Sequence, residues 1–125
     1  MKRFKIIALP GDGIGPEITR SALSILGVVS ESCNVDFQVI EKLVGGCSIE
    51  EFGVPLTDDT LDACLSSDAV FLGAVGGPKW DSVAHDKKPE RALLDLRREL
   101  GLFSNLRPAK VFDSLASSSS LKEDI

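Results

Sequence analysis

The feature that most constrains the fold is a glycine-rich turn between a short apolar run and a helical pattern. Residues 4–9 (FKIIAL) are apolar, and a Pro-Gly pair closes the run, which predicts a buried strand. Residues 16–32 then follow a helical pattern. Pro16 suits the first helical position because its φ is already helical, and Glu17 complements the helix dipole. The sequence therefore predicts a strand that turns directly into a helix.

The alternation of strand and helix continues along the chain. Residues 35–41 (VDFQVIE) alternate apolar and polar side chains and predict a second strand, and residues 48–52 predict one helical turn. Thr57 can cap a helix that runs to residue 66. Residues 68–73 (DAVFLG) predict a third strand, whose apolar character is typical of a strand covered on both faces. This order predicts an α/β fold with an open, mostly parallel sheet and flanking helices.

The second half of the chain begins with a long polar loop. Residues 74–89 show no periodicity, and loops of this length in compact domains are often functional. A helix over residues 90–100 follows, and Gly101 suits the position that ends it. Residues 102–112 are expected to be extended, because a proline disfavours the α conformation in the residue before it.

The serine-rich stretch at residues 114–120 has two interpretations. It is either a linker, or it leads into a further helix, since Ser120-Leu-Lys-Glu123 matches a capping box. A helix that begins so close to Ile125 is too short to be stable in water, so we expect residues 1–125 to be the N-terminal part of one longer domain.

Composition excludes several classes of function. Fourteen Lys and Arg against 19 Asp and Glu give a net charge of -5, which disfavours nucleic-acid binding. No apolar run is long enough for a membrane span or a signal peptide. Cys33, Cys47 and Cys64 form no C-x-x-C pair, and His85 is the only histidine, so neither a zinc site nor a redox pair is predicted. We expect three reduced thiols in core positions and a reducing compartment.

The glycines of the first turn stand at Gly11, Gly13 and Gly15. A dinucleotide-binding fingerprint would place its third glycine at position 16, where this chain has Pro16. We therefore interpret the turn as a device that packs a strand closely against a helix, not as a phosphate cradle.

One arginine of the predicted helix lies among leucines. On a helical wheel Leu93, Leu94, Leu96 and Leu100 form one stripe, and Arg97 falls inside it. A guanidinium there needs an anionic partner. The partner is either a bound ligand or a structural carboxylate, and a snorkelling side chain is the further alternative.

A second arginine, Arg107, is held extended before Pro108 and can converge with Arg97. Two arginine forks suit a substrate with two carboxylates, such as a malate-type acid. Arg98 faces away from the leucine stripe and is expected to be a solvated surface charge.

Three stretches together resemble the isocitrate/isopropylmalate dehydrogenase family. They are LPGDGIGPE at residues 9–17, GAVGGPKWD at residues 73–81, and PERALLDLRRELGLFSNLRPAK at residues 89–110. The resemblance spans nearly the whole chain and weakens only in the serine-rich stretch. Within the family, the absence of serine and threonine from residues 89–101 favours an aliphatic substituent on the malate substrate.

The resemblance implies an NAD-dependent oxidative decarboxylation of 3-isopropylmalate to 2-oxoisocaproate, in leucine biosynthesis. It implies Mg²⁺ or Mn²⁺ as the metal, with ligands outside this chain, and a homodimer as the assembly. A cytoplasmic location is expected, or the plastid stroma in a plant or alga. Homoisocitrate and tartrate are the alternative substrates.

The resemblance also implies roles for particular residues. Arg97 and Arg107 bind the malate carboxylates, and Leu93 and Leu94 form the pocket for the isopropyl group. The residues that line the nicotinamide side of the cofactor site are Gly76, Gly77, Pro78, Lys79, Trp80, Asp81, Ser82, Val83, Ala84, His85, Asp86, Lys87, Lys88, Pro89 and Glu90.

The family's chemistry needs a tyrosine acid, a lysine base and metal-binding aspartates. This chain has no tyrosine, and none of its lysines or aspartates matches those positions, so no catalytic residue is assigned. We expect the 125 residues alone to be inactive. A non-catalytic truncated product, or a remnant that binds small molecules, is the alternative from a different class.

Overall fold

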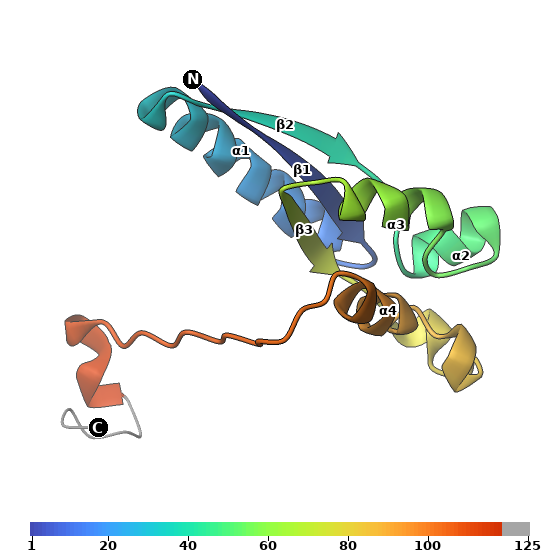
Figure 1. Ribbon diagram of the computed structural model, residues 1–125. Coiled ribbons are helices and arrows are strands. Elements are labelled where there is room, and N and C mark those ends of the chain that lie inside the picture. The colour runs from blue at the N-terminus through green and yellow to red at the C-terminus, as the bar shows by residue number, and fades with distance from the viewer. Residues whose placement is uncertain (119–125) are drawn as a thin grey trace.

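A parallel three-stranded sheet forms the centre of the fold (Figure 1). The computed structural model describes residues 1–118. The strands are β1 (Lys2–Gly11), β2 (Val35–Glu41) and β3 (Ala69–Ala74), in the order β2-β1-β3. Lys2 pairs with Val35 at one end of β1, and Gly11 pairs with Ala74 at the other. The apolar N-terminal run is thus the central strand.

The described residues also form four α-helices and three short 3₁₀ turns. The helices are α1 (Gly15–Cys33), α2 (Gly46–Phe52), α3 (Asp58–Leu65) and α4 (Arg91–Glu99). The turns are η1 (Pro78–Trp80), η2 (His85–Lys87) and η3 (Asp113–Ser118). This arrangement confirms the predicted α/β fold with an open parallel sheet and flanking helices.

The core lies on one face of the sheet. Ile7 and Leu9 are completely buried and belong to a cluster with Cys64 of α3 and Leu96 of α4. Because side chains alternate along a strand, the equally buried Ala8 points to the opposite face, which α1 covers. Two faces covered by helices explain why the central strand reads as an unbroken apolar run.

Two of the predicted helix signals, Thr57 and Gly101, are confirmed. Thr57 caps α3, and its hydroxyl accepts a hydrogen bond from the backbone amide of Thr60 at 3.2 Å. Gly101 adopts φ 65° after α4. The amide of Leu102 donates to the carbonyl of Arg97 at 3.0 Å, which completes a Schellman motif. Helix α1 begins at Gly15, one residue before the predicted start at Pro16.

Two expectations about burial are wrong. No residue of β3 is fully buried, because only β1 pairs with it among residues 1–118 and its other edge is open. Cys33 is exposed, whereas Cys64 is buried and Cys47 lies between these extremes. Cys33 is the last residue of α1, and within this helix only Gly15 and Thr19, both in its first half, are buried.

Beyond Gly101 the chain leaves the body of the fold as an extended segment (Figure 1). Residues 102–112 form neither helix nor strand, as predicted, and Phe103 is 100% exposed. The first part of the serine-rich stretch forms η3, and the predicted capping box at Ser120–Glu123 lies outside the described residues.

The glycine-rich turn joins β1 to α1 by close packing. A Cβ at Gly11 would overlap the carbonyl oxygen of Ala74, and φ is +75° there. A Cβ at Gly15 would overlap the carbonyl oxygen of Pro10 and lie 2.9 Å from the amide nitrogen of Ala74. These contacts support the interpretation of the turn as a packing device.

We predict that Gly11→Ala lowers the free energy of unfolding by more than about 2 kcal/mol, since it adds both backbone strain and a steric overlap. The matched control is Gly27→Ala in α1, where a Cβ would meet nothing within 4 Å. This control should stabilise the chain by about 0.5–1 kcal/mol. Urea denaturation followed by circular dichroism measures both, and equal effects would contradict the packing role of Gly11.

Candidate functional site

The segments that follow all three strands meet at one end of the sheet. Asp12 directly follows β1, the central strand. Gly46 and Cys47 begin α2, which comes after β2, and Gly76 comes two residues after β3. The carboxyl ends of parallel strands are where open α/β sheets place ligand sites, so this junction is the candidate site.

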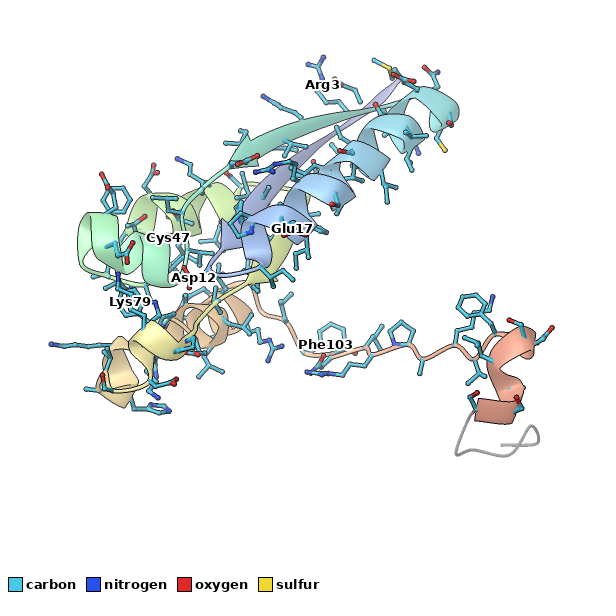
Figure 2. All side chains as sticks on the ribbon, turned by 180° about the vertical axis from the view of Figure 1, so that it is seen from behind. Arg3, Asp12, Glu17, Cys47, Lys79 and Phe103 are labelled. Carbon is cyan, nitrogen blue, oxygen red and sulfur yellow. The ribbon has the colours of Figure 1, made fainter. Side chains whose placement is uncertain are left out.

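The carboxylate of Asp12 joins the three segments (Figure 2). Its Oδ2 accepts hydrogen bonds from the amides of Gly46, at 2.6 Å, and Gly76, at 2.8 Å. Its Oδ1 accepts from the amide of Cys47 at 2.8 Å. The backbone amide of Asp12 also donates to the carbonyl of Ala74 at 2.7 Å. Hydrogen bonds to a charged acceptor are stronger than neutral ones, so one side chain fixes the relative positions of all three strand ends.

Helix α2 depends on this carboxylate for its N-terminal cap. Its own N-cap residue is Gly45, which has no side chain to accept the free amides of the first turn. Asp12, which lies far from α2 in the sequence, accepts hydrogen bonds from two of those amides. Its negative charge also complements the helix dipole.

A cavity of about 360 Å³ opens beside Asp12. Its walls come from the glycine-rich turn, from α2 and from the loop after β3: Asp12, Gly13, Gly46, Cys47, Glu50, Gly76, Gly77, Pro78, Lys79 and Trp80. The predicted cofactor residues 76–80 therefore line a hollow together with residues that the sequence did not single out.

Trp80 holds the loop against α2. A Cβ at Gly46 would lie 2.6 Å from the Cε2 atom of the Trp80 indole, so only glycine permits this contact. Lys79 forms an ion pair with Glu50 of α2, and its ammonium group lies 5.3 Å from the centre of the Trp80 ring. Figure 2 shows Lys79 on the same side of the sheet end as Asp12 and Cys47.

The two ends of the predicted cofactor loop lie together. A Cβ at Gly76 would lie 3.0 Å from the carboxylate carbon of Glu90, so the two residues are in contact. Pro89 is buried, whereas Gly77, Lys79 and Glu90 are exposed. The loop thus closes on itself and stays accessible to a ligand.

The first turn of α1 does not offer its amides to a phosphate. The amide of Gly15 donates to the carbonyl of Asp12 at 2.8 Å, and those of Glu17 and Ile18 donate to the carbonyl of Ile14 at 3.1 Å. Pro16 has no amide proton. These satisfied donors support the view that the turn is structural.

The single leucine stripe predicted for α4 is wrong. The buried face consists of Ala92 and Leu96, with Leu93 partly buried. Leu94 is 50% exposed and Arg97 is exposed. The helical wheel grouped residues that belong to two different faces of α4. Ala92 and Leu96 pack on the sheet, whereas Leu94 and Arg97 lie outside that contact.

Arg97 and Arg107 are both exposed, and no ion pair joins either of them to a side chain that the structure describes. Arg107 lies on the extended segment after α4. Arg98 is also exposed, as predicted, and pairs with Glu99 at 2.8 Å and with Asp95 at 3.3 Å. The hydrogen bond to Glu99 raises the pKa of Arg98 above its usual value.

Cys47 faces the Asp12 carboxylate, and its thiol lies 3.1 Å from the carbonyl oxygen of Val44. Burial is the main cause that raises the pKa of Cys47, and the neighbouring Asp12 charge adds to it. Burial also raises the pKa of Cys64. Within residues 1–118 no group of three or more His, Cys, Asp or Glu side chains is placed to hold a metal ion. In the same part of the chain, no helix is long and apolar enough to cross a membrane.

Sequence reasoning missed Asp12, Cys47 and Glu50 as parts of this site. A usable signal was present, because α2 begins at Gly46, directly after Gly45, and has no capping side chain of its own. An aspartate directly after the central strand is a candidate for supplying that cap. The pairing in space between Asp12 and Gly46 is, however, a product of the strand order and is not visible in either segment alone.

Over residues 5–125 the sequence matches the family described as isocitrate/isopropylmalate dehydrogenase, and the chain belongs to this family. It is 55% identical over 125 residues to a 3-isopropylmalate dehydrogenase of Clostridium acetobutylicum and 54% identical over 125 residues to one of Aquifex aeolicus. Both alignments include 100% of this chain. They include 35% and 34% of the two relatives, so the chain spans about a third of their length.

Two solved structures are similar in fold. An isocitrate dehydrogenase of Methylococcus capsulatus matches 79% of this chain and 26% of its own, with 32% identity and a TM-score of 0.62. A β-decarboxylating dehydrogenase of Thermococcus kodakarensis matches 80% of this chain and 27% of its own, with 33% identity and a TM-score of 0.56. The described fold is therefore part of the dehydrogenase fold of this family.

We predict that iodoacetamide modifies the exposed Cys33 at least about ten times faster than Cys47 or Cys64, because burial hinders access and raises the pKa of the other two thiols. Mass spectrometry of the native chain measures the rates, and unfolding in urea should equalise them. Equal rates in the native chain would contradict the burial of Cys47.

Raised thiol pKa values also set the sign of a pH dependence. As the pH rises, the thiols of the unfolded chain lose their protons before those of the folded chain. The contribution of Cys47 and Cys64 to the free energy of unfolding is therefore complete below about pH 9 and falls as the pH rises above it.

Proposed function

We propose that this chain is the part of an NAD-dependent 3-isopropylmalate dehydrogenase that recognises the substrate and positions the nicotinamide side of the cofactor. The observation that carries the proposal is 54–55% identity, over the whole chain, to proteins of that name. The overall reaction would be the oxidative decarboxylation of 3-isopropylmalate to 2-oxoisocaproate in leucine biosynthesis. The homodimer, the metal ion and a cytoplasmic location remain predictions.

The exposed part of α4 supports the substrate assignment. Leu94 and Arg97 lie one turn apart, and both side chains are accessible. An aliphatic group and a guanidinium side by side suit a malate that carries an alkyl substituent. Arg107 would supply the second fork once the extended segment is fixed by binding, and Leu93 would complete the alkyl pocket.

The cavity beside Asp12 supports the cofactor assignment. It is bordered by residues 76–80, and Gly77 leaves open space where a side chain would stand. NAD, when bound, accepts the hydride from the substrate carbon that carries the hydroxyl group. The role of this chain would be to hold the nicotinamide end with residues 76–90 and to keep water away with Trp80. Residues 1–118 do not include a set of metal ligands, and no metal-dependent step is assigned to them.

The reaction can be tested in a chimera. In this protein the chain replaces the matching third of the Clostridium acetobutylicum relative. We expect NADH formation from 3-isopropylmalate, and none from the 125 residues alone, which contain no tyrosine to act as the family's acid. Turnover by the isolated chain, or a folded chimera that accepts only homoisocitrate or tartrate, would contradict the proposed function.

In the chimera, Arg97→Gln should lower kcat/KM for 3-isopropylmalate, because a substrate carboxylate loses its charged partner. The expected loss of transition-state stabilisation is about 2–5 kcal/mol. The matched control is Arg98→Gln, which removes the same charge from the next residue of α4, where Arg98 pairs with Glu99 and Asp95. This control should change kcat/KM less than about threefold. Similar losses in both variants would remove Arg97 from the substrate site.

Leu94→Ser should reduce the preference of the chimera for 3-isopropylmalate over malate by about 10- to 200-fold, since a pocket contact with the isopropyl group is worth about 1–3 kcal/mol. Leu65→Ser is the control, because Leu65 is 52% exposed on α3, close to the 50% of Leu94. Steady-state kinetics with both substrates measures the preference. An unchanged preference in Leu94→Ser would exclude Leu94 from the alkyl pocket.

A further inference from the structure

The hydrogen bonds of Asp12 have a consequence for the loop after β3. Gly76 is the first residue of the predicted cofactor loop, and its amide donates to Oδ2 of Asp12 at 2.8 Å. The same oxygen accepts from Gly46 at 2.6 Å. Loop and helix therefore share a single acceptor atom, and neither can move away without breaking a charge-assisted hydrogen bond.

Two further contacts depend on the position of this junction. Trp80 lies against Gly46, at the start of α2. Glu90 lies against Gly76, at the start of the loop. Two residues of the loop, Trp80 and Glu90, thus each contact a glycine whose amide donates to Asp12.

The neighbouring ion pair is a weaker candidate for holding the loop. Lys79 and Glu50 are 69% and 52% exposed, and exposed pairs contribute little to stability. The Asp12 carboxylate is partly buried and makes three hydrogen bonds to backbone amides, which have no rotamers to lose.

We propose that Asp12 is a positioning residue for the cofactor-facing loop, which it holds in register with α2 so that Trp80 and Glu90 keep fixed places at the cavity. Asp12 itself would contact neither the substrate nor the reacting atoms. The inference rests on the proposed function where it assigns residues 76–90 to the cofactor, and it deepens that function by naming what fixes the loop.

Trp80 provides a direct readout on the chain itself. It is the only tryptophan and the chain has no tyrosine, so the intrinsic fluorescence reports on this side chain. Asp12→Asn replaces one acceptor oxygen with an amino group, so at least one of the three amides loses its acceptor. Acrylamide should then quench Trp80 at least about twice as efficiently, while the far-ultraviolet circular dichroism stays unchanged.

Two matched variants keep the test decisive. Asp62→Asn removes an exposed carboxylate on α3 that forms no ion pair among residues 1–118, and the quenching should not change. Glu50→Gln removes the ion pair with Lys79 but keeps the Lys79 side chain beside the Trp80 ring, and it should alter the quenching by less than about 1.3-fold. If Glu50→Gln exposes Trp80 while folded Asp12→Asn does not, the ion pair positions the loop and the proposal is overturned. Should Asp12→Asn fail to fold, a large effect of Glu50→Gln alone still overturns it.

Kinetics in the chimera separate positioning from stability. A displaced loop raises KM for NAD by at least about fivefold in Asp12→Asn, whereas a simple loss of folded protein lowers the apparent kcat and leaves KM unchanged. An unchanged KM for NAD would therefore overturn the proposal. If the unmodified chimera forms no NADH, the proposed function fails, and the quenching of Trp80 still decides whether Asp12 holds the loop.

Discussion

The arrangement of the strand ends depends on one carboxylate, that of Asp12. A parallel sheet brings the carboxyl ends of its strands to one end of the sheet. The hydrogen bonds between the strands do not, however, hold together the loops that follow them. Asp12 follows the central strand, β1. Its carboxylate accepts hydrogen bonds from backbone amides in the segments that follow β2 and β3. Gly11 and Gly46 are required next to it because the carbonyl of Ala74 and the indole of Trp80 occupy the space where their side chains would stand. The signature glycine-rich turn is thus the support of the site and not a phosphate cradle.

Local signals were sufficient to predict most of the fold. The start of α1, the Thr57 cap and the Gly101 end of α4 are decided by residues within one turn of each other, and the sequence shows them directly. Burial was harder to predict because it depends on what packs against each face. Cys33 looks like a core thiol but lies at the exposed end of α1, and Arg97 shares a wheel sector with leucines that divide between two surfaces.

The candidate site also has a part that could be predicted from the sequence and a part that depends on the fold. Residues 76–80 were predicted from the resemblance, and they do line a cavity. Asp12, Cys47 and Glu50 complete that cavity from segments that are distant in sequence, and only the strand order brings them to the loop. Arg97 and Arg107 are both exposed, and their joint role in substrate binding is a proposal. The chain spans about a third of the length of these relatives.

Native-state hydrogen exchange, followed by NMR on the unmodified chain, tests the central role of Asp12 most directly. The amides of Gly46, Cys47 and Gly76 share its carboxylate and should exchange at similar rates. Gly77 is exposed, and its amide makes no backbone hydrogen bond among residues 1–118. We predict that Gly76 exchanges at least about ten times more slowly than Gly77, after correction for intrinsic rates. Equal exchange at Gly76 and Gly77, with Gly46 still protected, would show that Asp12 caps α2 but does not hold the loop.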